Sequence, residues 1–240
     1  YVKFNSRFIV GGADSGWATT HASKNNPNAG DGNVDVTLSN AYFGFTAIPN
    51  TVINIGKMGL ATPYTVATDI NGNEQTGTGI LALSTFGPIT AGVGYFNNTN
   101  LNNSFELNAQ QGLGLESQLT NGNTGATGVL DGGSDMYVAT VQGDLDFVKL
   151  EAWYAGLQET FNSYTLAATS NLDLAENAKL GLEARYVNLK MNQDAANRIN
   201  NIPANVNTET KNDMFRFAVD GKFSIVNARL AYTKTDKDGG

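Results

Sequence analysis

The chain has 240 residues, a formal net charge of −7, no cysteine and only 15 % charged residues. An acidic balance without clustered Lys and Arg argues against nucleic acid as a partner, and the lack of thiols fits an oxidising export route. No apolar run approaches the roughly 20 residues that a membrane-spanning helix needs. Lipid would therefore have to be contacted by strands, which is feasible only in a closed barrel.

Alternation of apolar and polar residues predicts eleven strands. In the first strand the even-numbered residues Val2 and Phe4 are apolar, and the odd-numbered residues Lys3 and Asn5 are polar. We call the even-numbered and odd-numbered positions of a strand its two parities. Such alternation gives each strand one apolar and one polar face. In chain order, the predicted strands cover residues 1–10, 34–47, 51–57, 77–86, 89–97, 135–145, 147–158, 161–172, 179–190, 213–224 and 226–235.

The connections between these strands alternate between two length classes. Short connections are expected at 48–50, 87–88, 146, 173–178 and 225, and long ones at 11–33, 58–76, 98–134 and 191–212. Only the seventh and eighth strands are joined by a short connection where a long one is due. This sorting predicts an all-β fold, an antiparallel up-and-down transmembrane β-barrel. The alternative is a soluble all-β sandwich or binding module, which would purify without detergent.

The number of predicted strands is odd. Single-chain bacterial barrels have an even number of strands and bring both termini to the periplasmic side. We therefore interpret residues 1–240 as one β-barrel domain that is an internal portion of a longer protein, with further strands outside this sequence.

Several short motifs carry a resemblance to a known family. They are Asn54-Ile55-Gly56-Lys57 with Gly77-Thr78-Gly79-Ile80 after a long loop, Gly92-Val93-Gly94-Tyr95-Phe96, Leu150-Glu151-Ala152-Trp153-Tyr154 and Leu180-Gly181-Leu182-Glu183-Ala184-Arg185-Tyr186. In this order the chain resembles the Campylobacter-type major outer membrane protein, a porin. The resemblance implies a barrel of about sixteen to eighteen strands that is wide enough for an aqueous channel, a homotrimer, and a location in the bacterial outer membrane.

Charged residues on the polar parity would face water inside such a barrel and set the field there. The alternative is that they are solvated side chains in cross-strand pairs worth about 0.5 kcal/mol each. The predicted pore-lining residues are Lys3, Arg7, Lys149, Glu151, Glu183, Arg185, Arg216, Asp220, Lys222 and Arg229.

The connection over 58–76 is the candidate constriction loop, because it follows the third strand and by resemblance to porins folds into the lumen. Its candidate residues are Asp69, Asn71, Asn73 and Glu74. Asp69, Asn71 and Asn73 match the start of an EF-hand calcium loop, in which oxygen ligands recur at every second residue. The rest of the pattern fails, because Glu74 occupies the position of the required glycine and Ile80 that of the closing bidentate Glu. An EF-hand is thereby excluded. A looser Ca²⁺ site in the lumen using Asp69 stays open, and so does a plain Asn-Gly turn at Asn71.

No catalytic constellation is found. The Gly77-Thr78-Gly79 stretch begins a strand rather than following one and opening a helix, so it does not predict a dinucleotide site. His21 is the only histidine, so we expect neither a histidine-based triad nor a multi-histidine metal site. We expect no enzyme and no required cofactor.

Aromatic residues near strand ends predict interfacial girdles against lipid. They are Tyr42, Phe43, Phe45, Phe86, Tyr95, Phe96, Phe147, Tyr154, Phe161, Tyr186 and Tyr232. The leading functional hypothesis is a general diffusion porin that passes ions and small hydrophilic solutes. The alternatives are a plugged structural or adhesive outer-membrane barrel that presents long surface loops and, more distantly, an outer-membrane enzyme.

Overall fold

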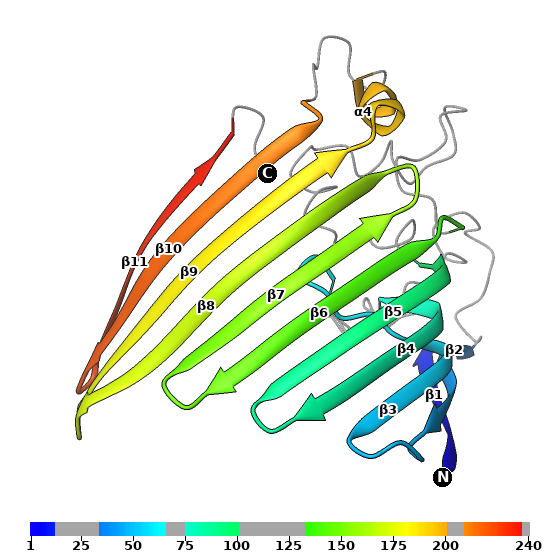
Figure 1. Cartoon of the computed structure of the whole chain (residues 1–240), viewed down its shortest axis with the longest axis horizontal. Helices are drawn as coiled ribbons and strands as arrows, with labels where there is room; N and C mark the ends of the chain where they lie inside the picture. Colours follow the sequence, from blue (N-terminus) through cyan, green and yellow to red (C-terminus); the bar gives the residue numbers. More distant parts are fainter. Residues whose placement is uncertain (13–33, 66–74, 101–132, 201–208, 237–240) are drawn as a thin grey trace.

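The computed structural model describes residues 1–12, 34–65, 75–100, 133–200 and 209–236. They form one eleven-stranded antiparallel sheet in which each strand pairs with its neighbour in sequence (Figure 1). The strands are β1 (Val2–Gly12), β2 (Val34–Phe45), β3 (Thr51–Gly59), β4 (Thr76–Phe86), β5 (Ile89–Thr99), β6 (Met136–Leu145), β7 (Val148–Leu157), β8 (Phe161–Ala175), β9 (Ala178–Met191), β10 (Lys211–Phe223) and β11 (Val226–Thr235). The predicted all-β fold class and the predicted order of elements are confirmed.

The strand boundaries differ most from prediction between β8 and β9. Residues 173–178 were expected to form a connection, yet β8 runs to Ala175 and β9 begins at Ala178. The pairing continues because Asp173 and Lys179 are cross-strand partners and their side chains form an ion pair at 3.0 Å. The polar residues that suggested a loop therefore belong to the ladder.

A short helix, α4 (Gln193–Asn200), lies within the predicted connection 191–212. The side chain of Asn192 accepts a hydrogen bond from the Asp194 N–H at 2.9 Å, which satisfies one of the free donors at the helix start. Ala195 and Ala196 are fully buried. No helix in the described part of the chain is long and apolar enough to span a membrane.

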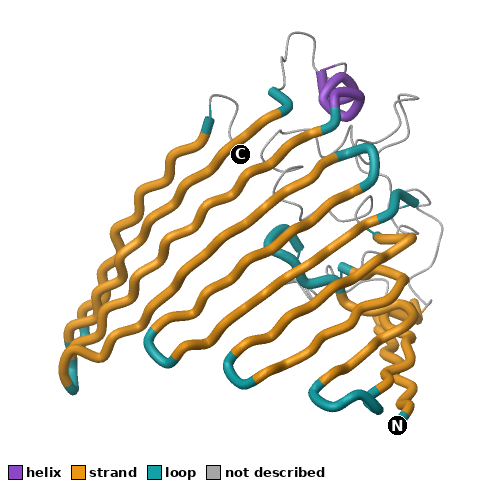
Figure 2. Tube along the Cα trace, viewed as in Figure 1, coloured by secondary structure: helices purple, strands orange, loops and turns teal. Residues whose placement is uncertain are grey.

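The two ends of the sheet are built differently. Short hairpins join β2 to β3, β4 to β5, β6 to β7, β8 to β9 and β10 to β11 at one end, called here the turn end (Figure 2). Residues with positive φ lie in four of these turns: Asn50, Gly87, Asp146 and Ser224. The opposite end, called the loop end, carries the connections that include undescribed residues. The β7–β8 turn, with Glu159 at φ 56°, also lies at the loop end.

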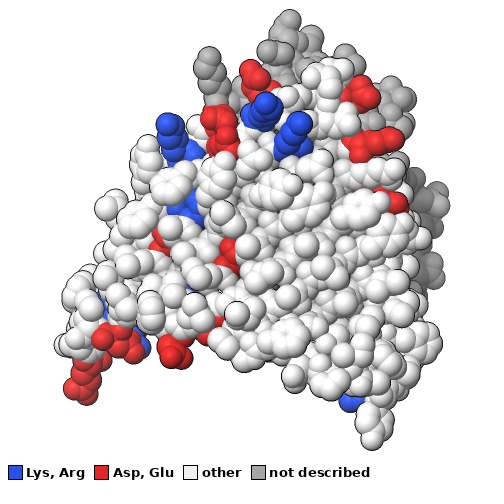
Figure 3. Space-filling model, in the orientation of Figure 1, with Lys and Arg blue, Asp and Glu red and all other residues white. Residues whose placement is uncertain are grey.

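Cross-strand partners share a face of an antiparallel sheet, so the register separates two faces. One face, called the outer face, carries Val141, Leu166 and Phe215 in a single cross-strand row, and these side chains are 54 %, 56 % and 46 % exposed. The predicted separation of apolar and polar parities is therefore confirmed. Figure 3 shows a largely uncharged outer face, with Lys, Arg, Asp and Glu gathered toward its two ends.

Two glycines allow β2, β3, β4 and β5 to approach closely. Gly56 has φ +132°, and a Cβ there would lie 2.4 Å from the carbonyl oxygen of Ala41. Its cross-strand partner is Gly79, where a Cβ would lie 2.0 Å from the carbonyl oxygen of Tyr95, beside a register shift in the β4–β5 pair. No larger residue fits either position without a backbone shift.

Candidate functional site

The face opposite the apolar one, called the inner face, carries most of the charged side chains of the described strands. The register places all ten predicted pore-lining residues on this face: Lys3, Arg7, Lys149, Glu151, Glu183, Arg185, Arg216, Asp220, Lys222 and Arg229. That they line a water-filled pore remains a prediction, which we take up below.

Five of these residues form one cluster on β9, β10 and β11, called here the arginine cluster: Glu183, Arg185, Arg216, Asp220 and Arg229. The Glu183 carboxylate lies 3.5 Å from Arg185 Nε, 3.7 Å from Arg216 Nε and 3.0 Å from an Arg229 terminal nitrogen. Arg229 Nε also lies 3.6 Å from Asp220. The side chain of Glu183 is 17 % exposed, so it lies beneath the guanidinium groups rather than in bulk water.

The arginine cluster is held together against its own repulsion. Arg185 and Arg216 are direct cross-strand partners, an arrangement in which like charges destabilise the pair. Glu183 contacts both and offsets that repulsion. The buried Nε atom of Arg216 has no hydrogen-bond partner. Its ion pair with Glu183 is therefore the interaction that offsets the cost of burying this atom. Because the cluster contains three arginines and two carboxylates, it is net positive.

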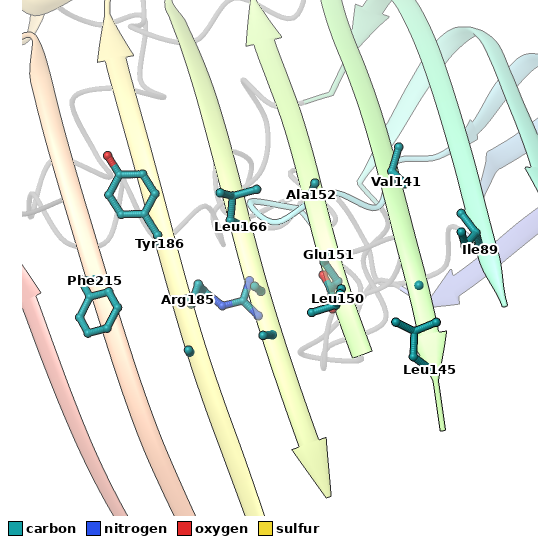
Figure 4. Close-up of a pocket in the computed structure, with 14 residues that line it drawn as sticks. Ile89, Val141, Leu145, Leu150, Glu151, Ala152, Leu166, Arg185, Tyr186 and Phe215 are labelled. Carbon is teal, nitrogen blue, oxygen red and sulfur yellow. The ribbon is translucent and has the colours of Figure 1, made fainter. Parts of the chain in front are cut away.

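A second row on the inner face extends the charged surface toward β7. Glu151 lies in the same row as Arg185, with Ala167 between them on β8. Figure 4 shows the Arg185 side chain extending from β9 across β8, on the side of Glu151. The Glu151 carboxylate accepts a hydrogen bond from the Trp153 indole N–H at 3.2 Å. The small side chain of Ala167 leaves room between the two charges.

The segment that follows β3 lies against the inner face. Residues 60–65, called the anchored segment, form a tight turn in which Thr65 Oγ1 donates to the Leu60 carbonyl at 2.7 Å. Tyr64 reaches β8, where its hydroxyl hydrogen-bonds Ser163 and its ring packs edge-on against Phe161 with centroids 5.8 Å apart. Figure 1 shows this part of the chain behind the sheet. Burial raises the pKa of the Tyr64 phenol.

An apolar cluster surrounds the anchored segment. It contains Met58, Leu60, Phe96, Met136, Val138, Ala155 and Leu157, with Tyr42, Tyr64, Leu81 and Phe161 packed against it. Burying a large apolar side chain stabilises by about 1.5–3 kcal/mol, so this contact fixes the segment firmly. The inner face thus has a dry part beneath the anchored segment and a charged part on β9–β11.

Three predicted girdle aromatics are corrected by this packing. Tyr42, Phe96 and Phe161 belong to the inner apolar cluster, and Phe96 is 1 % exposed. They lie near strand ends, as the girdle prediction required, but on the inner parity. That parity is the signal in the sequence that could have revealed the apolar cluster.

The predicted constriction residues Asp69, Asn71, Asn73 and Glu74 lie outside the described residues, and so does the candidate Ca²⁺ ligand Asp69. Within the described ranges, no group of three or more His, Asp or Glu side chains is placed to hold a metal ion. What the structure does show is that the start of this connection lies on the inner face.

A curved antiparallel sheet with an apolar outer face, a charged inner face and a segment folded against its inside has the geometry of the wall of an up-and-down β-barrel. Solved structures with this fold are outer-membrane channels. OccD3 (OpdP) of Pseudomonas aeruginosa superposes with a TM-score of 0.61 at 16 % identity, over 85 % of this chain and 45 % of that one. OccAB3 of Acinetobacter baumannii gives 0.62 at 12 %, over 87 % and 47 %.

The outer membrane protein OprD of Pseudomonas aeruginosa gives 0.62 at 16 % identity, over 84 % of this chain and 43 % of that one. At these identities the similarity establishes the fold. The chain spans less than half the length of the structures it matches. No protein-family model matches the chain, and no curated protein matches it by sequence.

Proposed function

We propose that the chain is an internal part of an outer-membrane porin that forms a water-filled channel for the passive passage of ions and small hydrophilic solutes. The observation that carries the proposal is the division of the sheet into two faces. Exposed Val141, Leu166 and Phe215 on one face suit lipid, and the arginine cluster on the other suits water.

In this proposal, strands outside this sequence pair with β1 and β11 and close the barrel. A barrel of sixteen to eighteen strands leaves an aqueous lumen. The Campylobacter-type relationship and the homotrimeric state are part of the same proposal. Crosslinking of the full-length parent in membranes tests the oligomer, and a monomer only would refute that part.

A plugged barrel is the second candidate, and the anchored segment is the observation that favours it. Tyr64 holds the start of a connection against the inner face, and in a closed barrel this segment would narrow the lumen. In a plugged barrel the long connections would present an adhesive surface, and no solute would cross.

The absence of native cysteine allows a direct test. Thr169→Cys on the inner face and Ala168→Cys on the outer face are adjacent, half-buried positions of β8. In the full-length parent reconstituted in a bilayer, a water-soluble sulfonated thiol reagent should modify position 169 and reduce the single-channel conductance. Position 168 should stay protected by lipid.

The outcomes separate the candidates. Stable ohmic steps that fall on modification of position 169 support an open porin. Residence in the outer-membrane fraction without discrete conductance would refute the open channel and support the plugged barrel. Purification without detergent, with equal modification of both cysteines, would refute the membrane location itself.

A further inference from the structure

A tryptophan side chain lies on the inner face of β7, at the border between the apolar and charged parts of that face. Trp153 pairs with Thr140 on β6 and with Thr165 on β8, which puts its indole ring on the inner face. The next inner position toward the loop end is Ala155, a member of the apolar cluster, and the next toward the turn end is Glu151. Because Trp153 is half-buried, part of its ring is accessible on the inner face.

Polar groups converge around the indole ring. The indole N–H donates to Glu151 Oε2 at 3.2 Å, which turns the polar edge of the ring toward the turn end. Among the described residues this N–H is the one donor bound to the Glu151 carboxylate, so the second carboxylate oxygen stays available as an acceptor. Gln142 is the direct cross-strand partner of Glu151, and its amide nitrogen donates to Thr140 at 3.2 Å. An aromatic ring, a carboxylate and an amide therefore share one pair of strands.

The charges beside Trp153 balance. Glu151 and Arg185 lie in one row with β8 between them, two strand spacings or about 10 Å apart, and Arg185 extends across β8 on the side of Glu151 (Figure 4). Arg185 and its partner Arg216 both contact Glu183. Two guanidinium groups thus accompany two carboxylates. A ligand with a net charge of either sign would meet one attractive and one repulsive partner in this row.

The free polar atoms of this row suit hydroxyl groups. Among the described residues Arg185 is paired through Nε only, so its two terminal nitrogens remain donors. A carboxylate such as Glu151 only accepts hydrogen bonds, and a guanidinium only donates them. A hydroxyl does both, so neighbouring hydroxyls on a neutral molecule can satisfy each side. Small-molecule sites commonly combine an aromatic surface with a few convergent polar groups of this kind.

We propose that Trp153, Glu151, Gln142 and Arg185 form a subsite for a neutral sugar on the inner face. The apolar C–H face of one pyranose ring packs on the indole, one hydroxyl donates to the Glu151 carboxylate, and another accepts from Arg185. The anchored segment contacts β8 one inner row nearer the loop end and bounds the subsite on that side. The inference rests on the proposed function in requiring that the inner face meets water.

The test titrates the full-length parent, folded in a zwitterionic detergent without a sugar head group, with maltose. Binding is followed by saturation-transfer difference NMR, which needs no conductance. The parent should bind maltose, with the strongest saturation at the ring C–H protons. Trp153→Ala removes the stacking surface and should weaken maltose binding about tenfold. Trp153→Phe keeps an aromatic ring and should stay within about threefold of the parent.

Further variants and one probe define the site and the ligand. Tyr154→Ala removes an aromatic ring from the outer face of the same strand and should leave maltose binding unchanged. Trp153→Leu keeps apolar bulk without an aromatic face and should show the tenfold loss even where Trp153→Ala does not fold. Glu151→Gln removes the charge from one hydrogen bond and should weaken maltose binding about threefold. Tetramethylammonium at the same concentration should not compete with maltose.

The proposal is overturned if the parent does not bind maltose, if Trp153→Leu binds it as tightly as the parent, or if Tyr154→Ala weakens binding equally. Competition by tetramethylammonium that is lost in Glu151→Gln would also overturn it, because the site would then be one for cations. Conductance of the same preparations in salt alone tests the proposed function separately. A parent that conducts without binding maltose keeps the channel and loses the subsite. A parent that binds maltose through Trp153 but never conducts keeps the subsite and refutes the open channel.

Discussion

Glu183→Gln is the substitution that most directly tests how the arginine cluster acts on ions. The change removes one negative charge at near-constant shape. Glu183 is the carboxylate shared by Arg185, Arg216 and Arg229, at 3.0 to 3.7 Å. Without it, Asp220 is the one carboxylate left in the arginine cluster, and it pairs with Arg229. The net positive charge of the cluster should rise by one.

The magnitude follows from Coulomb's law. A unit charge acts on an ion about 5 Å away in water with about 0.8 kcal/mol, which salt at 0.1 M reduces to about 0.5 kcal/mol. The local anion concentration then rises about twofold and the cation concentration falls by the same factor. The anion-to-cation permeability ratio should therefore rise about fivefold at 0.1 M salt and less than twofold at 1 M salt.

The measurement is the reversal potential of the full-length parent and its variants in planar bilayers under a salt gradient. Glu176→Gln makes the same chemical change in the β8–β9 turn and should leave the ratio unchanged. Glu183→Asp keeps the charge and should hold the ratio near that of the parent. An unchanged reversal potential for Glu183→Gln at low salt would show that permeating ions do not pass the arginine cluster.

Three further substitutions test the fold and the anchored segment. Tyr64→Phe removes the hydroxyl that hydrogen-bonds Ser163 on β8. It should lower the free energy of unfolding in urea by about 1 kcal/mol and increase open-channel noise. Noise and stability equal to those of the parent would show that apolar packing alone holds the anchored segment. Gly79→Ala places a Cβ 2.0 Å from a carbonyl oxygen and should lower the folded fraction on refolding into vesicles. At Gly143 a Cβ would lie 3.9 Å from its nearest neighbour, a Leu145 side-chain atom. Gly143→Ala should therefore fold as the parent does. Val141→Arg on the outer face should cost about 2–4 kcal/mol in lipid. Gln142→Arg changes the adjacent, half-buried position on the inner face and should cost far less; similar losses would contradict the assignment of the two faces.

The strands were predictable because alternation is a local signal. In β7, Leu150 and Glu151 reveal their faces through their immediate neighbours, and the register in the structure agrees with that parity. Turn chemistry at Asp146 likewise marks a hairpin without reference to the rest of the chain. Faces and strand order therefore follow from residues close in sequence.

The contacts that shape the site are not local, and alternation does not encode them. Tyr64 and Ser163 are 99 residues apart, and Arg229 and Glu183 are 46 apart. Parity placed Glu183 and the arginines on one face, but only the register of three strands shows that a single carboxylate contacts all of them. Helix α4 was missed because its eight residues are flanked by polar sequence, although Asn192 followed by Ala195 and Ala196 is a usable signal.

The division of the inner face into a dry and a charged part separates the residues that hold the sheet from those that carry its charge. Leu60, Phe96 and Leu157 hold the fold on one part of the wall, while Glu183 and its arginines occupy another. In the proposed channel, a substitution among the charged residues would change the field at the wall and leave the packed cluster intact. The charge of the wall can thus vary while its shape is kept, and superpositions above 0.6 at 12 % to 16 % identity show that this shape tolerates extensive sequence change.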